Sequence, residues 1–221
     1  NTIFDNNKLY NPKENDLGKT MDICAVLHNA NNMLLKNVII QNTNVSYVPY
    51  SNNPFEGIIF NEKGKLEING SIIKDNTVYF PENLMGVIYN EATTAELVIS
   101  NSIIIGNTHM QRTAEKAIIN NKGTATLDNN YWGTNEPAFS SLISGTTPSN
   151  NVVLSFTPEE LTAGQEKTFE IDYKVNDEIA NTMPNYNLTV NSKKLGSKDV
   201  EIKNGVGQYT YLPITAGEDT V

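Results

Sequence analysis

The hydrophobic positions of the first 135 residues come in short bursts that recur roughly every 30 residues. Residues 57–61 (GIIFN) are matched by residues 86–90 (GVIYN), and residues 25–29 (AVLHN) and 116–120 (KAIIN) are looser copies. Each copy ends at an asparagine. Self-similarity at a fixed period is typical of repeat architectures. The pattern therefore predicts successive copies of one structural unit.

Two further hydrophobic segments follow each copy, and neither has a helical period. One is seen at 66–68 and 97–99, and the other at 37–43, 71–77 and 102–108. Three strand-length segments in each unit predict a parallel β-helix, in which each strand pairs with its counterpart about 4.8 Å away in the next coil. A β-sandwich of short strands is the alternative, but it does not explain the matching columns. Residues 1–7 match the end of a unit, so we expect the chain to begin inside a repeat.

Aligning the units predicts columns of like residues. Three hydrophobic columns are placed inside the coils, although a slip of one residue would turn each strand's faces over. The columns are Leu27, Ile59, Ile88 and Ile118; Ile68, Ile99 and Leu127; and Ile39, Ile73, Ile104 and Trp132. Asn29, Asn61, Asn90 and Asn120 are expected to stack at one corner and to bond through their amides. Tyr131 and Trp132 are bulky and come last, so they are predicted to cap the open end.

The repeat stops before the C-terminal third of the chain. Of the 33 asparagines, 27 lie in residues 1–151 and 6 in residues 152–221. Residues 136–151 contain Pro137, Gly145 and Pro148 and are predicted to be a connector. Residues 152–221 alternate in strand fashion between glycine and asparagine turns, which favours a small β-sandwich. This region ends within a strand-like pattern, so we expect a truncated domain and a fragment of a longer protein.

Composition and charge narrow the classes of partner. The net charge is -9, and Arg112 is the single arginine among 16 basic residues. A surface that follows phosphates needs clustered lysine and arginine, so we do not expect nucleic acid or an anionic membrane as a partner. No apolar run approaches the ~20 residues of a membrane-spanning helix. Cys24 is the single cysteine, which forbids an internal disulfide.

These motifs resemble adhesin-like surface proteins of methanogenic archaea. The resemblance covers about residues 25–135 and is carried by residues 86–90, by residues 97–108, and most specifically by the closing Asn-Asn-Tyr-Trp-Gly-Thr-Asn of residues 129–135. It implies an all-β chain, with right-handed parallel β-helix coils over 1–135, the connector 136–151, and a bacterial-type Ig-like β-sandwich over 152–221. It also implies export to the cell surface, with signal and anchor outside this fragment, and binding to carbohydrate or protein on another cell. The family supplies no catalytic residues and no cofactor.

An enzyme is the main alternative, because parallel β-helices also carry polysaccharide lyases and hydrolases. Glu62 and Glu91 follow stacked asparagines and would lie one coil apart, near the carboxylate spacing of a retaining glycosidase. Solvated turn residues explain them as well. His28, Cys24 and His109 have no spacing that fits a zinc site, so no metal is predicted. Asp172, Asp177 and Glu178 could help to bind calcium at the end of the β-sandwich, although they lack the loop signature of a calcium site.

Aromatic residues supply the candidate binding site. The column of His28, Phe60, Tyr89 and Ile119 is either an outward stripe or part of the wall. Insertions at about 44–56, 78–85 and 109–116 are expected to leave the coils at one corner and to form one face. The predicted ligand-binding residues there are Tyr47, Tyr50, Phe55, Tyr79 and Phe80. We therefore expect a monomeric, non-catalytic adhesin that binds a glycan or a surface protein; a stalk without a ligand is the third interpretation.

Overall fold

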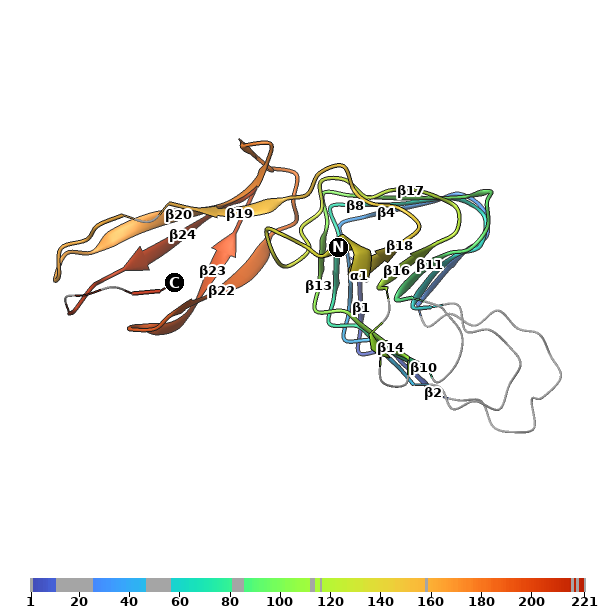
Figure 1. Cartoon of the computed structure of the whole chain (residues 1–221), viewed down its shortest axis with the longest axis horizontal. Coiled ribbons are helices and arrows are strands. Elements are labelled where there is room, and N and C mark those ends of the chain that lie inside the picture. The colour runs from blue at the N-terminus through green and yellow to red at the C-terminus, as the bar shows by residue number, and fades with distance from the viewer. Residues whose placement is uncertain are drawn as a thin grey trace. The chain divides into compact units, whose positions relative to one another are not determined.

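A computed structural model describes most of the chain, which has an all-β fold (Figure 1). The described residues are 2–10, 26–46, 57–80, 86–111, 114–115, 117–157, 159–215, 217 and 219–220. Contacts within the chain define two compact units, Asn1–Asn151 (unit 1) and Val152–Val221 (unit 2). They are described separately.

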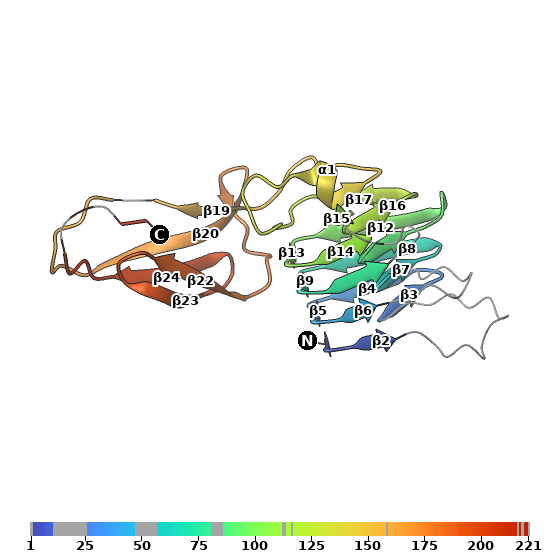
Figure 2. The ribbon, with the colours of Figure 1, turned by 60° about the horizontal axis from the view of Figure 1, so that its bottom comes forward.

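Unit 1 is built from four stacked sheets of short strands, in which the neighbours come from successive coils and run parallel (Figure 2). Sheet I contains β1 (Thr2–Asp5), β5 (Val38–Gln41), β9 (Ile72–Lys74) and β13 (Ile103–Ile105). Sheet II contains β2 (Lys8–Tyr10), β6 (Asn44–Ser46), β10 (Thr77–Phe80) and β14 (Thr108–Gln111), with β15 (Ala114–Glu115) antiparallel to β14. Sheet III contains β3 (Leu27–Asn29), β7 (Ile59–Asn61), β11 (Ile88–Asn90), β16 (Ile119–Asn121) and β18 (Ile143–Ser144). Sheet IV contains β4 (Met33–Lys36), β8 (Gly64–Asn69), β12 (Ala95–Ser100) and β17 (Thr124–Thr126). This arrangement is consistent with the predicted parallel β-helix.

Each coil has four strands rather than the predicted three. The additional strands are those of sheet II, which the sequence interpretation placed at the start of the insertions. They form because their middle residues fill the interior: Val45 and Val78 are fully buried, and His109 takes the same position in the next coil. The insertions therefore begin later than expected.

The interior of unit 1 is a continuous apolar core made by the predicted hydrophobic columns. In two of these columns, one member differs by one residue from the prediction. Leu27, Ile59 and Ile88 are continued by Ile119, not by Ile118. Ile73 and Ile104 follow Ile40, not Ile39. Ile40 is 1% exposed whereas Ile39 is only half-buried, because alternate residues of a strand face opposite sides. The column of Ile68 and Ile99 lies inside as predicted.

The last coil is closed by residues that the sequence interpretation assigned partly to a connector. Trp132 is buried against the core and meets Phe139 edge-on, with ring centroids 5.7 Å apart. Tyr131 pairs with Ile103 of the preceding coil and is also buried. Phe139 begins the short helix α1 (Phe139–Leu142), and β18 then adds to sheet III with Ile143 buried. Residues 136–151 therefore belong to unit 1, because Ile143 completes its core.

Unit 2 consists of antiparallel strands. β20 (Lys167–Val175) pairs with β19 (Val153–Phe156), β21 (Glu178–Ile179) and β24 (Val206–Tyr211), and β22 (Tyr186–Ser192) pairs with β23 (Gly196–Ile202). The alternate residues of both sheets are buried. They are Phe169, Ile171, Tyr173, Val190, Val200, Ile202, Tyr209 and Tyr211. Unit 2 thus contains two antiparallel sheets, and each contributes buried alternate residues.

Candidate functional site

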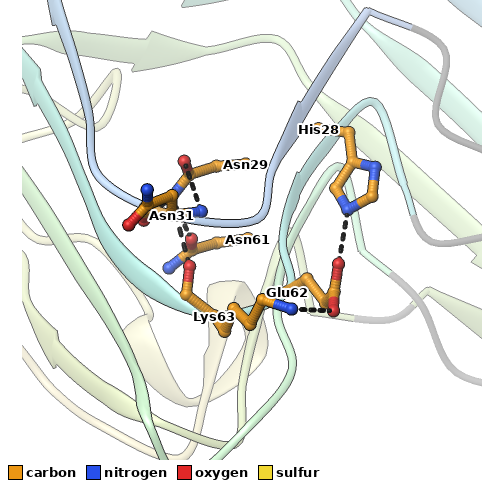
Figure 3. Close-up of polar contacts among 6 residues, drawn as sticks. All are labelled: His28, Asn29, Asn31, Asn61, Glu62 and Lys63. Atoms are coloured by element: carbon orange, nitrogen blue, oxygen red, sulfur yellow. Dashed lines mark hydrogen bonds and ion pairs between the residues drawn. The ribbon is translucent and has the colours of Figure 1, made fainter.

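A ladder of buried asparagine side chains runs through the corner between sheets III and IV. Asn29 Nδ2 donates to Asn61 Oδ1 at 2.7 Å (Figure 3). Asn61 Nδ2 in turn donates to Asn90 Oδ1 at 2.6 Å. Asn90 Nδ2 continues the ladder to Asn121 Oδ1 at 2.7 Å. The amides of Asn29, Asn61 and Asn90 also bond nearby carbonyls, as Asn61 Nδ2 does with Glu96 O at 3.0 Å. The ladder satisfies polar groups that no water reaches, so its role is structural.

Asn120 is not the fourth member of this ladder. It pairs in register with Tyr89, and Asn121 pairs with Asn90. Asn120 lies on the other face of β16, where its Oδ1 accepts a hydrogen bond from Ser144 Oγ at 2.9 Å. The two consecutive asparagines allow two alignments, and the structure has the one in which Ile119 pairs with Ile88 and Asn121 joins the ladder.

A charged cluster lies at the start of the same turn, on the outer side of sheet III (Figure 3). Lys63 Nζ is 3.2 Å from Glu62 Oε1, and His28 Nε2 is 3.0 Å from Glu62 Oε2. The hydrogen bonds from Lys63 and then from His28 hold the pKa of Glu62 below its usual value. Glu62 is therefore ionised at neutral pH.

This cluster bears on the carboxylate pair that the enzyme alternative requires. Glu62 N–H bonds Asn29 O and Glu91 N–H bonds Asn61 O, so the two residues do occupy the same position in successive coils. Both carboxylate oxygens of Glu62 are already engaged, one by Lys63 Nζ and the other by His28 Nε2. A general acid needs a raised pKa, and the environment of Glu62 does the opposite.

The aromatic column predicted from the repeat is present with one member changed. The rings of His28 and Phe60 stack with centroids 4.8 Å apart, and those of Phe60 and Tyr89 at 5.7 Å. The fourth position is Asn120 rather than Ile119, because of the shifted register. Phe60 and Tyr89 are each 1% exposed, and Lys122 Nζ lies 5.2 Å from the Tyr89 ring centroid. A hydrogen bond to Tyr89 raises the pKa of Lys122. The column is therefore part of the wall.

The outer side of sheet II offers a different surface. Because Val78 points inward, Thr77 and Tyr79 of β10 point outward. Thr77 Oγ1 and Thr108 Oγ1 are hydrogen-bonded at 3.1 Å. Tyr79 is 44% exposed, and in the described part of the chain it is the one aromatic residue among the large exposed hydrophobic side chains. We call Asn44, Thr77, Thr108, Tyr79 and its register partner Met110 the Tyr79 face.

Of the five predicted ligand-binding residues, the structure describes two. Tyr79 lies on the strand β10 and not in an insertion, and Phe80 ends that strand. Tyr47, Tyr50 and Phe55 lie outside the described residues. The sequence interpretation did not include Thr77 and Thr108 among the candidate residues. Their recurrence is visible in the alignment, because each directly follows an asparagine, Asn76 or Asn107, in successive units.

Unit 2 contains a hollow of about 890 Å³. It is lined by residues of β19, β20 and β24 and by residues that follow β24, such as Pro213 and Asp219. Aromatic residues line it, including Phe156, Tyr209 and Tyr211. Asp219 accepts hydrogen bonds from Ser192 Oγ at 2.5 Å and from Tyr211 Oη at 2.7 Å. The bond from Ser192 is the main reason that the pKa of Asp219 is lowered. These bonds tie the end of the chain to β22.

Within the described residues, His, Cys, Asp and Glu do not gather in any group of three or more that could hold a metal ion, and this holds for Asp172, Asp177 and Glu178. Cys24 lies outside the description. None of the helical structure described is long and apolar enough to cross a membrane.

Comparison of the chain with protein-family models, with curated proteins and with solved structures gives no match.

Proposed function

We propose that the chain is part of a non-catalytic cell-surface adhesin, in which unit 1 presents the Tyr79 face to a glycan outside the cell. Tyr79 is the observation that carries this proposal. A half-exposed aromatic ring offers an apolar surface for the C–H groups of a sugar, and its hydroxyl stays available for hydrogen bonding. The hydroxyl groups of Thr77 and Thr108 and the amide of the exposed Asn44 lie in the next row of the same sheet.

The rigid surroundings of this surface support a binding role. Val78 and Val45 anchor the strands from inside, and each strand is paired in parallel with its neighbours. A site on strands holds its side chains more accurately than one on loops, so less entropy is lost on binding. The acidic net charge of -9 favours a neutral or basic ligand surface over a strongly anionic one.

The finer fold assignment belongs to the same proposal. We take unit 1 as coils of a right-handed parallel β-helix and unit 2 as an Ig-like module that acts as a spacer. The support for the second assignment is that β20 pairs antiparallel with β19 on one edge and with β24 on the other, while β22 and β23 contribute a second, facing set of buried residues.

Replacing Tyr79 tests the proposal. On a glycan array, we expect the chain to bind at least one neutral glycan and Tyr79→Ala to weaken that binding about tenfold or more, since a central aromatic anchor is worth more than ~1.4 kcal/mol. The control is Leu34→Ala, because Leu34 is a similarly exposed apolar side chain on sheet IV. Equal losses for both variants would contradict a specific role for Tyr79.

Two other outcomes would replace the proposal. Binding to no glycan and no cell surface would favour a stalk without a ligand. Turnover of a polysaccharide that is abolished by Glu62→Gln would favour the enzyme alternative instead.

A further inference from the structure

The Tyr79 face carries two parallel rows of side chains that run from coil to coil. The strands β6, β10 and β14 lie side by side in sheet II, so residues in register form rows along the axis of the coils. Figure 2 shows β14, β6 and β2 at successive levels of the stack. One row contains Asn44, Thr77 and Thr108, and the other includes Tyr79 and Met110. Both rows repeat at the strand spacing of about 4.8 Å.

The two rows differ in polarity. The first offers two hydroxyl groups and an amide, and Thr77 Oγ1 and Thr108 Oγ1 share one hydrogen bond at 3.1 Å. A hydroxyl group has one proton and two lone pairs, so this pair keeps one donor and several acceptor positions for a ligand. The second row is apolar, because Tyr79 is half-exposed and the thioether of Met110 is half-buried beside it. The rows are two residues apart along each strand, which is about 6.6 Å.

The two rows carry no charge. Within the described side chains of β6, β10 and β14, the outward positions are asparagine, threonine, tyrosine and methionine. Lys74 and Asp75, which precede β10, form an ion pair with each other, with Lys74 Nζ 3.8 Å from Asp75 Oδ2. A charged ligand laid on the rows would lose water without gaining a charged partner. The face therefore favours an uncharged ligand.

A straight chain of sugar rings matches both the polarity and the repeat of these rows. Each pyranose unit has apolar faces of C–H groups and edges of hydroxyl groups, and equatorial linkages advance the chain by nearly one strand spacing per unit. Laid along the rows, such a chain places its ring faces on Tyr79 and Met110 and its hydroxyl edges on the threonines. Asn44 and Thr108 lie two coils apart, or about 9.6 Å, so a single sugar ring cannot contact both.

We propose that the ligand of the Tyr79 face is a straight, uncharged polysaccharide that lies along the axis of the coils, with one sugar unit on each coil. This inference rests on the proposed function and adds the class of the glycan and its direction on the surface. Affinity then depends on the number of linked sugars, because each further unit reaches the next coil. The terminal sugar of a branched glycan would instead need only Tyr79 and its nearest neighbours.

Calorimetric titration with cello-, manno- and chito-oligosaccharides of increasing length tests the class of ligand. In at least one series, we expect the affinity to rise about threefold to tenfold with each sugar from the monosaccharide to the trisaccharide. Malto-oligosaccharides are the control for chain shape, because their axial linkage curves the chain, and their affinity should not rise with length. Binding of a monosaccharide or a branched glycan, without a gain in any straight series, would overturn this inference and leave the proposed function in place. Binding to no glycan would overturn both.

Two variants test whether the ligand spans the coils. We expect Asn44→Ala and Thr108→Val each to lower the affinity for the trisaccharide about threefold to tenfold, although the two residues lie in different coils. Tyr79→Ala should lower the affinity for every member of the series. The control is Thr126→Val, because Thr126 is an exposed threonine on the outer side of sheet IV, and it should leave the affinity unchanged. If only one of Asn44→Ala and Thr108→Val had an effect, the ligand would not span the coils and the inference would be wrong.

Discussion

Asn61→Ala lowers the free energy of unfolding of unit 1 by about 3–5 kcal/mol. Asn61 is fully buried, accepts a hydrogen bond from Asn29 and donates to Asn90 Oδ1 and Glu96 O. Alanine removes these bonds and leaves Asn90 Oδ1 and Glu96 O without this donor, at about 1–3 kcal/mol for each group left unsatisfied. Asn29 Nδ2 keeps its bond to Asn31 O, which limits the loss. Urea unfolding followed through Trp132, the single tryptophan, measures the change.

The matched control for Asn61→Ala is Asn120→Ala. Asn120 is also an asparagine on sheet III, but it is partly exposed and lies outside the ladder, where it bonds Ser144. We expect it to cost about 1 kcal/mol or less. If the two variants lost the same free energy, the ladder would not be the feature that stabilises the coils.

Gly64→Ala should destabilise unit 1 by several kcal/mol, about 3 or more. Gly64 has φ of +72°, and a Cβ atom there would lie 2.0 Å from Asn31 O in the backbone of the preceding coil. Neither atom can move away without parting the two coils. The cost combines left-handed strain of about 1–2 kcal/mol with the displacement of β4 from β8. The same urea titration measures it.

Gly106→Asn is the comparison that isolates the contact between coils. Gly106 also has positive φ, but the equivalent positions in the other coils are Asn6, Asn42 and Asp75, all with φ of 52–54°. The nearest atom to a Cβ atom at Gly106 belongs to the Asp75 side chain, whose carboxylate is half-exposed and free to turn. We expect a change below about 1 kcal/mol. A loss as large as that of Gly64→Ala would mean that backbone conformation, and not coil contact, explains both.

The repeat could be predicted from the sequence because the same residues return at the same places. Asn29, Asn61 and Asn90 end matching hydrophobic bursts, and the structure joins all three in one ladder. The last copy was misaligned because Asn120 and Asn121 are adjacent and either can end the match. Side chains of a strand alternate between its two faces, so a shift of one residue in the alignment exchanges the inward and outward positions of the whole segment. Hydrogen bonding to Asn90, which no sequence pattern reports, decides it.

The sheet II strands and the exposed site were less accessible to sequence reasoning. The strand β6 has three residues, and Val45 is its one inward side chain. A strand of this length is too short to give a periodic signal in the sequence. The next insertion follows it directly, so strand and loop merge in the sequence. Burial of Phe60 and Tyr89 could not be predicted either, because it depends on contacts between coils, such as the stacking of these two rings.

The most direct test of the parallel coil register is a disulfide between successive coils. Lys65 of β8 and Glu96 of β12 are register partners on the outer side of sheet IV, with Lys65 Nζ 3.7 Å from Glu96 Oε1. Neighbouring strands lie about 4.8 Å apart, within the Cα range of a disulfide, whereas diagonal partners lie at about 7–8 Å. In a Cys24→Ser background, Lys65→Cys with Glu96→Cys should cross-link under mild oxidation, and Lys65→Cys with Val98→Cys should not. Equal cross-linking of the two pairs, or cross-linking of the second pair alone, would contradict the register on which the coils, the ladder and the Tyr79 face depend.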